Sequence, residues 1–304
     1  MIVVTSGEAY TDIDGLACAV AYSELLGLEG KSSCVVLPGV LNHSVSSLVQ
    51  AQSYVLHESL PEDVSGFALV DISNNNFSSF VQKEQVLEVY DHHYGYKQMW
   101  EQYLSPENIH IEMIGACATL IWEAYKLRGF GAQISATSAN LLTIAIISNT
   151  LNLQSALTTA RDRDALVDLA EYNNLPTNWR EQYFAEQEQA LSVNPVATIT
   201  NDAKVQQIPA LADKLVIGQL ELWDGSTFFD THLSDVSTAL STFGHALWMM
   251  NIPSISEGKN YIYTEANIVQ HILQQALGCE FEDNICITDT LILRKEILKA
   301  LHNL

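Results

Sequence analysis

Basic residues are scarce in this chain of 304 residues. Lys and Arg number 14 against 36 Asp and Glu, which gives a formal net charge of −22 at pH 7. A protein that grips nucleic acid or an anionic membrane by bulk charge needs a basic surface, so the composition argues against both kinds of partner. Any anionic ligand must be held by a local arrangement of groups instead.

Paired cysteines and long apolar runs are also missing. The five cysteines are far apart and form no C-x-x-C motif, which argues against a disulfide scaffold and against a zinc knuckle. No window reaches the roughly 18 apolar residues in a row that a membrane span needs, and the first residues do not read as a signal peptide. We therefore expect a soluble, cytoplasmic protein.

The first 90 residues alternate short apolar runs with stretches of helical spacing. Unbroken apolar runs are typical of strands that are buried on both faces of a parallel sheet. Within these 90 residues the predicted strands are 2–4, 34–37, 67–70 and 86–90, and the predicted helix is 15–28. A more helical region follows, with predicted helices at 114–127, 136–147 and 156–172. This order predicts an α/β fold with an open, mostly parallel sheet flanked by helices.

A polar helix over residues 181–191, which follows a turn-rich stretch and ends before Pro195, marks the predicted domain boundary. We place one domain at residues 1–188 and a second at 189–304. In the second domain the pattern predicts strands at 214–223 and 261–263, a long helix at 231–250 and a helix at 268–277. These elements predict a second, smaller α/β domain.

Acidic residues directly follow three of the predicted strands. The clusters are Asp12-x-Asp14, Asp71 and Asp91-His92-His93. Because the carboxyl ends of parallel strands meet at one edge of a sheet, the topology can bring the clusters together. Alone, each has an ordinary interpretation: Asp12 as a helix N-cap, Asp71 as a turn former and the histidines as a buried pair.

Crowded carboxylates are costly unless cations neutralise them. A set rich in oxygen with one or two imidazoles suits manganese, magnesium or cobalt better than zinc or copper. The sequence therefore indicates a metal site at this edge of the sheet.

These clusters resemble the motifs of the DHH phosphoesterases, a family named for a tripeptide such as Asp91-His92-His93. The stretch 147–152 looks like the Ser-Asp-Thr helix end of that family, with Asn149 where an aspartate is usual. Residues 202–204, 217–221 and 294–295 resemble the C-terminal domain of the manganese-dependent inorganic pyrophosphatases and exopolyphosphatases, including the prune-like branch. The resemblance covers nearly the whole chain, but the Gly-rich, His-containing motif of the nuclease branch is missing.

The resemblance implies two divalent metal ions, Mn²⁺ or Mg²⁺, with Co²⁺ as a further choice. Asp71 would bridge the two ions. Asp12 would bind the first ion, and Asp14 and His92 would bind the second. Two ions bridged by a carboxylate can activate a water and neutralise phosphoryl oxygens.

The resemblance also implies which residues meet the substrate. His93 would face the substrate phosphate, and Asp91 would brace the two histidines. Lys204, Arg294 and Lys295 would bind the phosphates from the second domain, which places the expected active site in the cleft between the domains.

Two positions depart from the pattern of the pyrophosphatases. Glu8 stands where a metal-binding histidine is usual, and Asn149 is a neutral and poorer ligand than aspartate. If Glu8 ligates, the gain at Glu8 offsets the loss at Asn149, and the site keeps four anionic ligands.

The expected activity is hydrolysis of a phosphoanhydride bond in pyrophosphate or a short polyphosphate by an enzyme that is a monomer or a homodimer. One alternative is a phosphodiesterase of the same family that acts on a nucleotide or signalling molecule. Another is a catalytically weak, phosphate-binding relative, which Glu8 and Asn149 would explain. Asp162 and Asp164 lie on a helix after Thr158-Thr159 and are interpreted as capping or solvating it, and aromatic packing is expected for Tyr94 and Tyr96.

Overall fold

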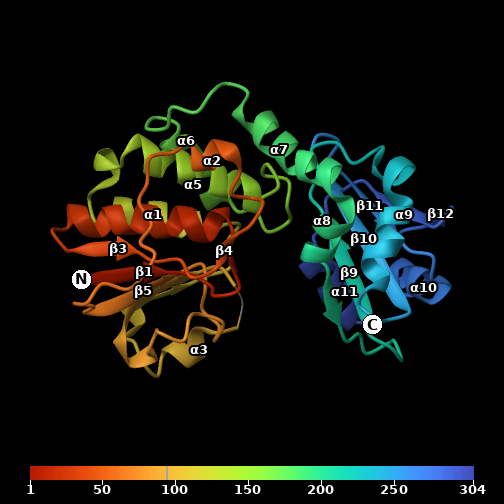
Figure 1. Cartoon of the computed structure of the whole chain (residues 1–304), viewed down its shortest axis with the longest axis horizontal. Coiled ribbons are helices and arrows are strands. Elements are labelled where there is room, and N and C mark those ends of the chain that lie inside the picture. The colour runs from red at the N-terminus through yellow and green to blue at the C-terminus, as the bar shows by residue number, and fades with distance from the viewer. Residues whose placement is uncertain (94) are drawn as a thin grey trace. The chain divides into compact units, whose positions relative to one another are not determined.

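Two compact units make up the chain (Figure 1). Unit 1 comprises residues 1–153 and 157–180, and unit 2 comprises residues 154–156 and 181–304. The computed structural model describes every residue of the chain except residue 94, and the side chains at 187 and 190–192 are also outside the description. The predicted boundary at residue 188, and a site between the domains, stay predictions.

A five-stranded, entirely parallel sheet forms the centre of unit 1, with strand order β3-β1-β5-β6-β7. Its strands are β1 (Ile2–Thr5), β3 (Ser33–Val35), β5 (Gly66–Val70), β6 (Val86–Asp91) and β7 (Ile109–Ile111). Every residue of β5 is buried, as expected for a central parallel strand. The predicted parallel sheet is confirmed; β7 was not predicted because three residues carry too little pattern.

Helices cover both faces of this sheet, with α1 and α5 on one face and α3 on the other (Figure 1). The helices of unit 1 are α1 (Ile13–Leu28), α2 (Ser47–Gln50), α3 (Lys97–Trp100), α4 (Cys117–Leu127), α5 (Ala136–Asn149) and α6 (Ala160–Leu169). Short 3₁₀ turns lie at Lys83–Gln85, Pro106–Asn108 and Gly131–Gln133. The helix α7 (Trp179–Val193) contains the division between the units.

A separate two-stranded parallel ribbon lies outside the main sheet of unit 1. It pairs β2 (Tyr10–Thr11) with β4 (Val40–Leu41), and Tyr10 is the register partner of Val40. Both side chains are exposed, Tyr10 at 51 % and Val40 at 77 %. Thr11, the other residue of β2, is buried, so the ribbon exposes one pair of side chains and turns Thr11 toward the interior of the unit.

Unit 2 contains a six-stranded mixed sheet with strand order β12-β13-β11-β10-β9-β8. Its strands are β8 (Lys204–Gln206), β9 (Leu215–Gln219), β10 (Leu247–Ser254), β11 (Lys259–Tyr263), β12 (Phe281–Glu282) and β13 (Ile285–Thr288). The pair β9–β10 is parallel and the other neighbours are antiparallel.

Two apolar cores stabilise this mixed sheet. Its helices are α8 (Pro195–Asp202), α9 (Phe228–Ser241), α10 (Asn267–Leu277) and α11 (Arg294–His302). Ile199 of α8 and Leu240 of α9 belong to one core, and Val269 of α10 and Ile297 of α11 belong to the other. The predicted second α/β domain is confirmed.

The predicted long helix at 231–250 is wrong. The helix α9 ends at Ser241, Gly244 adopts a left-handed backbone with φ +72°, and β10 begins at Leu247. An apolar run of this length fits a buried strand as well as a helix, and the Gly is the signal that separates the two. Trp248 lies in the stretch predicted as helix and packs against the core from β10.

Candidate metal centre

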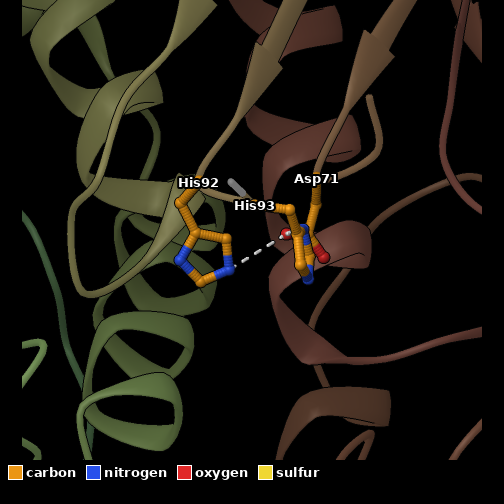
Figure 2. Close-up of side chains that lie close together, drawn as sticks. All are labelled: Asp71, His92 and His93. Carbon is orange, nitrogen blue, oxygen red and sulfur yellow. Dashed lines mark ion pairs between the residues drawn. The ribbon is translucent and has the colours of Figure 1, made fainter. Parts of the chain in front are cut away.

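Asp71, His92 and His93 form a cluster at the carboxyl ends of β5 and β6 (Figure 2). Each offers one ligand atom, and these atoms lie within 4.8 Å of one another. His92 Nε2 is 3.5 Å from Asp71 Oδ1, and His93 Nδ1 is 4.0 Å from the same oxygen. Two adjacent parallel strands thus bring together residues that are about twenty positions apart in the sequence.

Asp71 adopts an unusual backbone and lacks a hydrogen bond at one oxygen. Its φ is +55°, a left-handed conformation that Asp tolerates better than most residues, and its N–H donates to the carbonyl of Tyr90 at 2.8 Å. Oδ1 is buried and has no hydrogen-bond partner among the described residues. Burial, and then the charges of Asp12 and Asp14, raise the pKa of Asp71 well above its usual range.

Asp14 lies entirely inside the unit and is held by the first turn of α4. The N–H groups of Cys117 and Ala118 donate to its Oδ2 and Oδ1 at 2.8 and 2.9 Å. Burial, and then the charge of Asp12, raise the pKa of Asp14 to about 7, although the two backbone hydrogen bonds act in the opposite direction. His92 Nε2 is 3.8 Å from Asp14 Oδ2.

Asp91 is the fully buried acid that holds the histidine pair. Its Oδ1 accepts hydrogen bonds from the backbone N–H groups of His92 and His93, at 2.8 and 3.2 Å, and lies 2.7 Å from His93 Nδ1. Burial raises the pKa of Asp91, but the hydrogen bond and charge of His93 outweigh burial and hold that pKa below its usual value. Asp91 is therefore an ionised brace beneath the cluster.

The orientation of His92 is set by a backbone carbonyl. Its Nδ1 lies 3.1 Å from the oxygen of Ile114, which can only accept, so Nδ1 carries the proton. The lone pair of Nε2 then faces Asp71 and Asp14. This is the usual arrangement of a metal-binding histidine.

A cavity of about 160 Å³ opens beside the cluster. It is lined by Ser6, Gly7, Glu8, Ala9, Tyr10, Thr11, Asp12, Asp71, Ile72, Asn74, Asn76 and His93. No Lys or Arg is among these lining residues. The wall of the cavity is therefore acidic. A phosphate could bind there only together with cations that supply positive charge.

Asp12 and Glu8 occupy different positions on this wall. Asp12 is the N-cap of α1 and accepts from the N–H of Gly15 at 3.0 Å. Glu8 is exposed, and its Oε1 accepts from the hydroxyl of Ser78 at 3.4 Å. Both carboxylates lie on the cavity that Asp71 lines, and their binding of a metal stays a prediction.

Asn149 is the last residue of α5 and directs its amide back along the helix. Its Nδ2 donates to the carbonyl of Ala145 at 3.3 Å. Within the described part of the chain, Asn149 belongs neither to the three-residue cluster nor to the lining of the cavity.

The predicted phosphate-binding residues of unit 2 lie at the starts of β8 and α11. Lys204 is the register partner of Ile217, and Arg294 Nη1 is 3.3 Å from the carbonyl of Ile217, so these two basic residues are neighbours. Arg294 Nη1 also donates to a carboxylate oxygen of Asp202 at 3.0 Å, and the Arg294 side chain is 11 % exposed. Lys295 follows it on the exposed side of α11.

A network of buried amides holds the segment that leads to Arg294. Asn251 Nδ2 donates to Gln219 Oε1 at 2.9 Å and to the carbonyl of Ile292 at 2.8 Å. Asn260 Nδ2 donates to Asn251 Oδ1 at 2.7 Å, and Gln219 Oε1 also accepts from the N–H of Arg294.

Sequence reasoning missed two parts of this region. Asn74 and Asn76 line the cavity, and no local pattern marks them. Asp162 does take part in the cap of α6 with Thr159, as interpreted, but it is also fully buried and bonds two residues outside that cap. Tyr94 lies outside the described residues, and Tyr96 packs against the core of unit 1.

The donor set fits a divalent cation. The site has a buried carboxylate, Asp71, whose pKa is raised by burial and by the charges of its acidic neighbours. It also has an oxygen without a hydrogen bond among the described residues and an imidazole nitrogen 3.5 Å from that oxygen, and these groups suit a hard or borderline cation. A carboxylate cluster of this kind is unfavourable on its own because like charges repel in a medium of low polarity.

Known proteins with similar sequences cover nearly the whole chain. A probable manganese-dependent inorganic pyrophosphatase of Clostridium acetobutylicum is 27 % identical over 312 residues, which is 97 % of this chain and 95 % of that protein. The chain is related over nearly its full length to manganese-dependent inorganic pyrophosphatases. This relationship to phosphoanhydride hydrolases confirms the predicted resemblance. No protein-family model matches the chain.

Other relatives match over a shorter stretch. A protein of the same name from Lactobacillus helveticus is 29 % identical over 174 residues, and the chain spans about half the length of that relative, 54 %. Among solved structures, a Methanococcus jannaschii protein assigned to the family II inorganic pyrophosphatases has 21 % identity and a TM-score of 0.68 over 99 % of both chains. That likeness shows a shared fold. Among the described residues, no helix is long and apolar enough to cross a membrane.

Proposed function

We propose that this chain is a metal-dependent phosphohydrolase that cleaves the phosphoanhydride bond of pyrophosphate or a short polyphosphate. The observation that carries the proposal is the buried Asp71 oxygen, which accepts no hydrogen bond among the described residues and lies 3.5 Å from His92 Nε2. The full-length relatives named as manganese-dependent pyrophosphatases support the reaction class. A cytoplasmic location and a monomer or homodimer belong to the same proposal.

In this proposal the carboxylates of unit 1 hold two divalent cations, Mn²⁺ or Mg²⁺. Asp12 would hold the first, Asp14 and His92 would hold the second, and Asp71 would serve both. Glu8 would supply a fourth carboxylate. The bound cations supply charge that neutralises phosphoryl oxygens and lowers the pKa of an attacking water.

The remaining side chains orient the substrate and hold protons. His93 is 55 % exposed and is fixed through Nδ1 by Asp91, so its Nε2 is directed away from that carboxylate and can donate to a phosphate oxygen. Lys204, Arg294 and Lys295 bind the phosphate oxygens from unit 2. A planar guanidinium suits two oxygens at once, and an ammonium acts as a point charge.

Phosphate release tests the proposal directly. We would offer pyrophosphate, tripolyphosphate, longer polyphosphate and a cyclic dinucleotide, each with Mn²⁺ and with Mg²⁺. Rapid release from pyrophosphate or tripolyphosphate is expected, with little from the dinucleotide. Hydrolysis of the dinucleotide alone would favour the phosphodiesterase. Measurable binding of pyrophosphate without release of phosphate from any compound would favour the weak phosphate-binding relative that Asn149 suggests.

A further inference from the structure

Residues 114–119, which lead into α4, touch two of the proposed ligands of the second cation. The carbonyl of Ile114 accepts from His92 Nδ1 at 3.1 Å. The N–H groups of Cys117 and Ala118, three and four positions later, bind the two oxygens of Asp14. One short piece of backbone therefore sets the position of a carboxylate from the first turn of α1 and of an imidazole that follows β6.

Asp162 also binds this segment, through both of its carboxylate oxygens. Its Oδ2 accepts from the N–H of Gly115 at 3.1 Å, and its Oδ1 accepts from the hydroxyl of Thr119 at 2.6 Å. Oδ2 also accepts from the N–H and hydroxyl of Thr159, at 2.7 and 2.8 Å. The carboxylate thus holds the segment at two points and anchors it to the start of α6.

The fit between Asp162 and the segment leaves no free space. Asp162 is fully buried, and a Cβ added at Gly115 would lie 2.7 Å from Asp162 Oδ2 and from Thr150 Cγ2. A buried carboxylate is stable only when its oxygens are satisfied, and both oxygens of Asp162 accept hydrogen bonds. A helix cap alone needs only the bonds to Thr159, so the bonds to Gly115 and Thr119 require another explanation.

We propose that Asp162 is a positioning residue of the metal site. It fixes residues 114–119 so that Asp14 and the Nε2 lone pair of His92 converge on Asp71. Partners that orient metal ligands from outside typically change metal affinity by about 10- to 100-fold when they are removed. The inference rests on the proposed function in one respect only, namely that this site binds a divalent cation.

Binding of Mn²⁺ alone to chelator-treated protein, measured by calorimetry, tests the inference without any substrate. We expect Asp162→Asn to weaken Mn²⁺ binding by about 10- to 100-fold. Asp168→Asn is the matched control, because Asp168 lies on the same helix and bonds to Trp122 and Lys126 of α4 but not to residues 114–119. That control should bind Mn²⁺ as the wild type does.

Two further variants separate positioning from general destabilisation. Leu166→Ala removes a buried apolar side chain of α6 and lowers stability, but it should leave Mn²⁺ affinity unchanged. Thr119→Val should weaken Mn²⁺ binding, and Thr119→Ser, which keeps the hydroxyl, should restore it. A folded Asp162→Asn protein with wild-type Mn²⁺ affinity would overturn the inference, as would a loss of affinity in Leu166→Ala equal to that in Asp162→Asn.

The outcomes also separate this inference from the proposed function. If Mn²⁺ binds and Asp162→Asn weakens it, but no phosphate compound is hydrolysed, the inference holds and the proposed reaction is wrong. If the wild type binds no Mn²⁺, the proposed function and the metal-site role of Asp162 both fail, and amide hydrogen exchange of the metal-free protein decides whether Asp162 holds residues 114–119. Asp162→Asn should then speed exchange at Cys117 and Ala118 at least about tenfold, a local loosening that Asp168→Asn should not cause.

Discussion

Unit 1 buries carboxylates at the carboxyl edge of its sheet, whereas unit 2 buries amides across the middle of its own. In unit 1, burial and then the charges of Asp12 and Asp14 raise the pKa of Asp71, and one Asp71 oxygen lacks a hydrogen bond among the described residues. In unit 2, Asn251 uses both its amide hydrogens and its oxygen in hydrogen bonds, and Asn260 is equally buried.

The carboxylates of unit 1 are arranged like a binding site for a cation, whereas the amides of unit 2 satisfy one another. A satisfied amide network is neutral and stable by itself, while a crowd of buried carboxylates is unfavourable until a cation joins it. Unit 1 thus gathers negative charge at the edge of its sheet, and unit 2 holds Arg294 through a neutral amide network.

The largest effect is expected at Asp71, where the contrast between the buried carboxylates of unit 1 and the buried amides of unit 2 can be tested directly. Asp71→Asn should lower Mn²⁺-dependent phosphate release by roughly 10³-fold, the scale on which a group that stabilises transition-state charge acts. The same change should raise the stability of the metal-free protein by about 1 kcal/mol, because it removes a buried charge. Phosphate assays and urea unfolding with chelator measure the two effects, and Asp63→Asn, at an exposed acid, is the control. A metal-free variant less stable than the wild type would contradict the comparison.

Metal binding should stabilise the two units unequally. Mn²⁺ at 100 times its dissociation constant should raise the free energy of unfolding by about 2.7 kcal/mol. Hydrogen exchange should slow at residues 67–71, 90–93 and 114–119 of unit 1 and stay unchanged at 249–252 and 260–263 of unit 2. The control is the same protein in buffer that contains K⁺ in place of Mn²⁺ and no divalent cation. Equal slowing in both units would show that the cation is not specific to the carboxylate cluster.

A substitution in the amide network of unit 2 should lower stability and leave Mn²⁺ affinity unchanged, the reverse of what is expected at Asp71. Asn251→Ala leaves the amide of Asn260 and the carbonyl of Ile292 without their partner, and each such buried group costs about 1–3 kcal/mol. We expect urea unfolding to show a loss in that range, a raised KM for pyrophosphate and unchanged Mn²⁺ affinity. Gln275→Ala, at an exposed position of α10, should change none of these. A fall in Mn²⁺ affinity would mean that the two units are not independent.

Glu8 offers the smallest test. If it is a fourth anionic ligand, Glu8→Gln should weaken Mn²⁺ binding by about tenfold, or 1.4 kcal/mol, because the amide keeps the shape and loses the charge. Glu58→Gln, at another exposed acid, is the control in the same calorimetric experiment. Equal affinities for wild type and Glu8→Gln would leave three carboxylates in the site.

The parts that the sequence predicts are those that depend on local pattern and on the topology of parallel sheets. Apolar runs locate β1, β3, β5 and β6, and the rule that ligands bind at the carboxyl ends of strands accounts for the meeting of Asp71 with His92 and His93. Those residues could be named before any coordinates because each directly follows its strand.

The parts that it does not predict depend on contacts between distant residues. Asp14 is held by the N–H of Cys117, 103 positions away, and Asp162 reaches Gly115 across 47 positions. A local explanation, helix capping, already accounts for Asp162 in the sequence and hides its second role. The helix predicted at 231–250 failed for a different reason, since an apolar run alone does not distinguish a strand from a helix.

The ribbon of β2 and β4 has a consequence for how this protein can change. Tyr10, on β2, forms part of the cavity wall, yet the ribbon belongs to neither the five-stranded sheet nor its core. Because the Tyr10 side chain is 51 % exposed, substitutions at Tyr10 alter the cavity wall and leave β5 and β6, which carry Asp71 and the two histidines, in place. The lining of the cavity can therefore vary in evolution while the cluster is inherited intact.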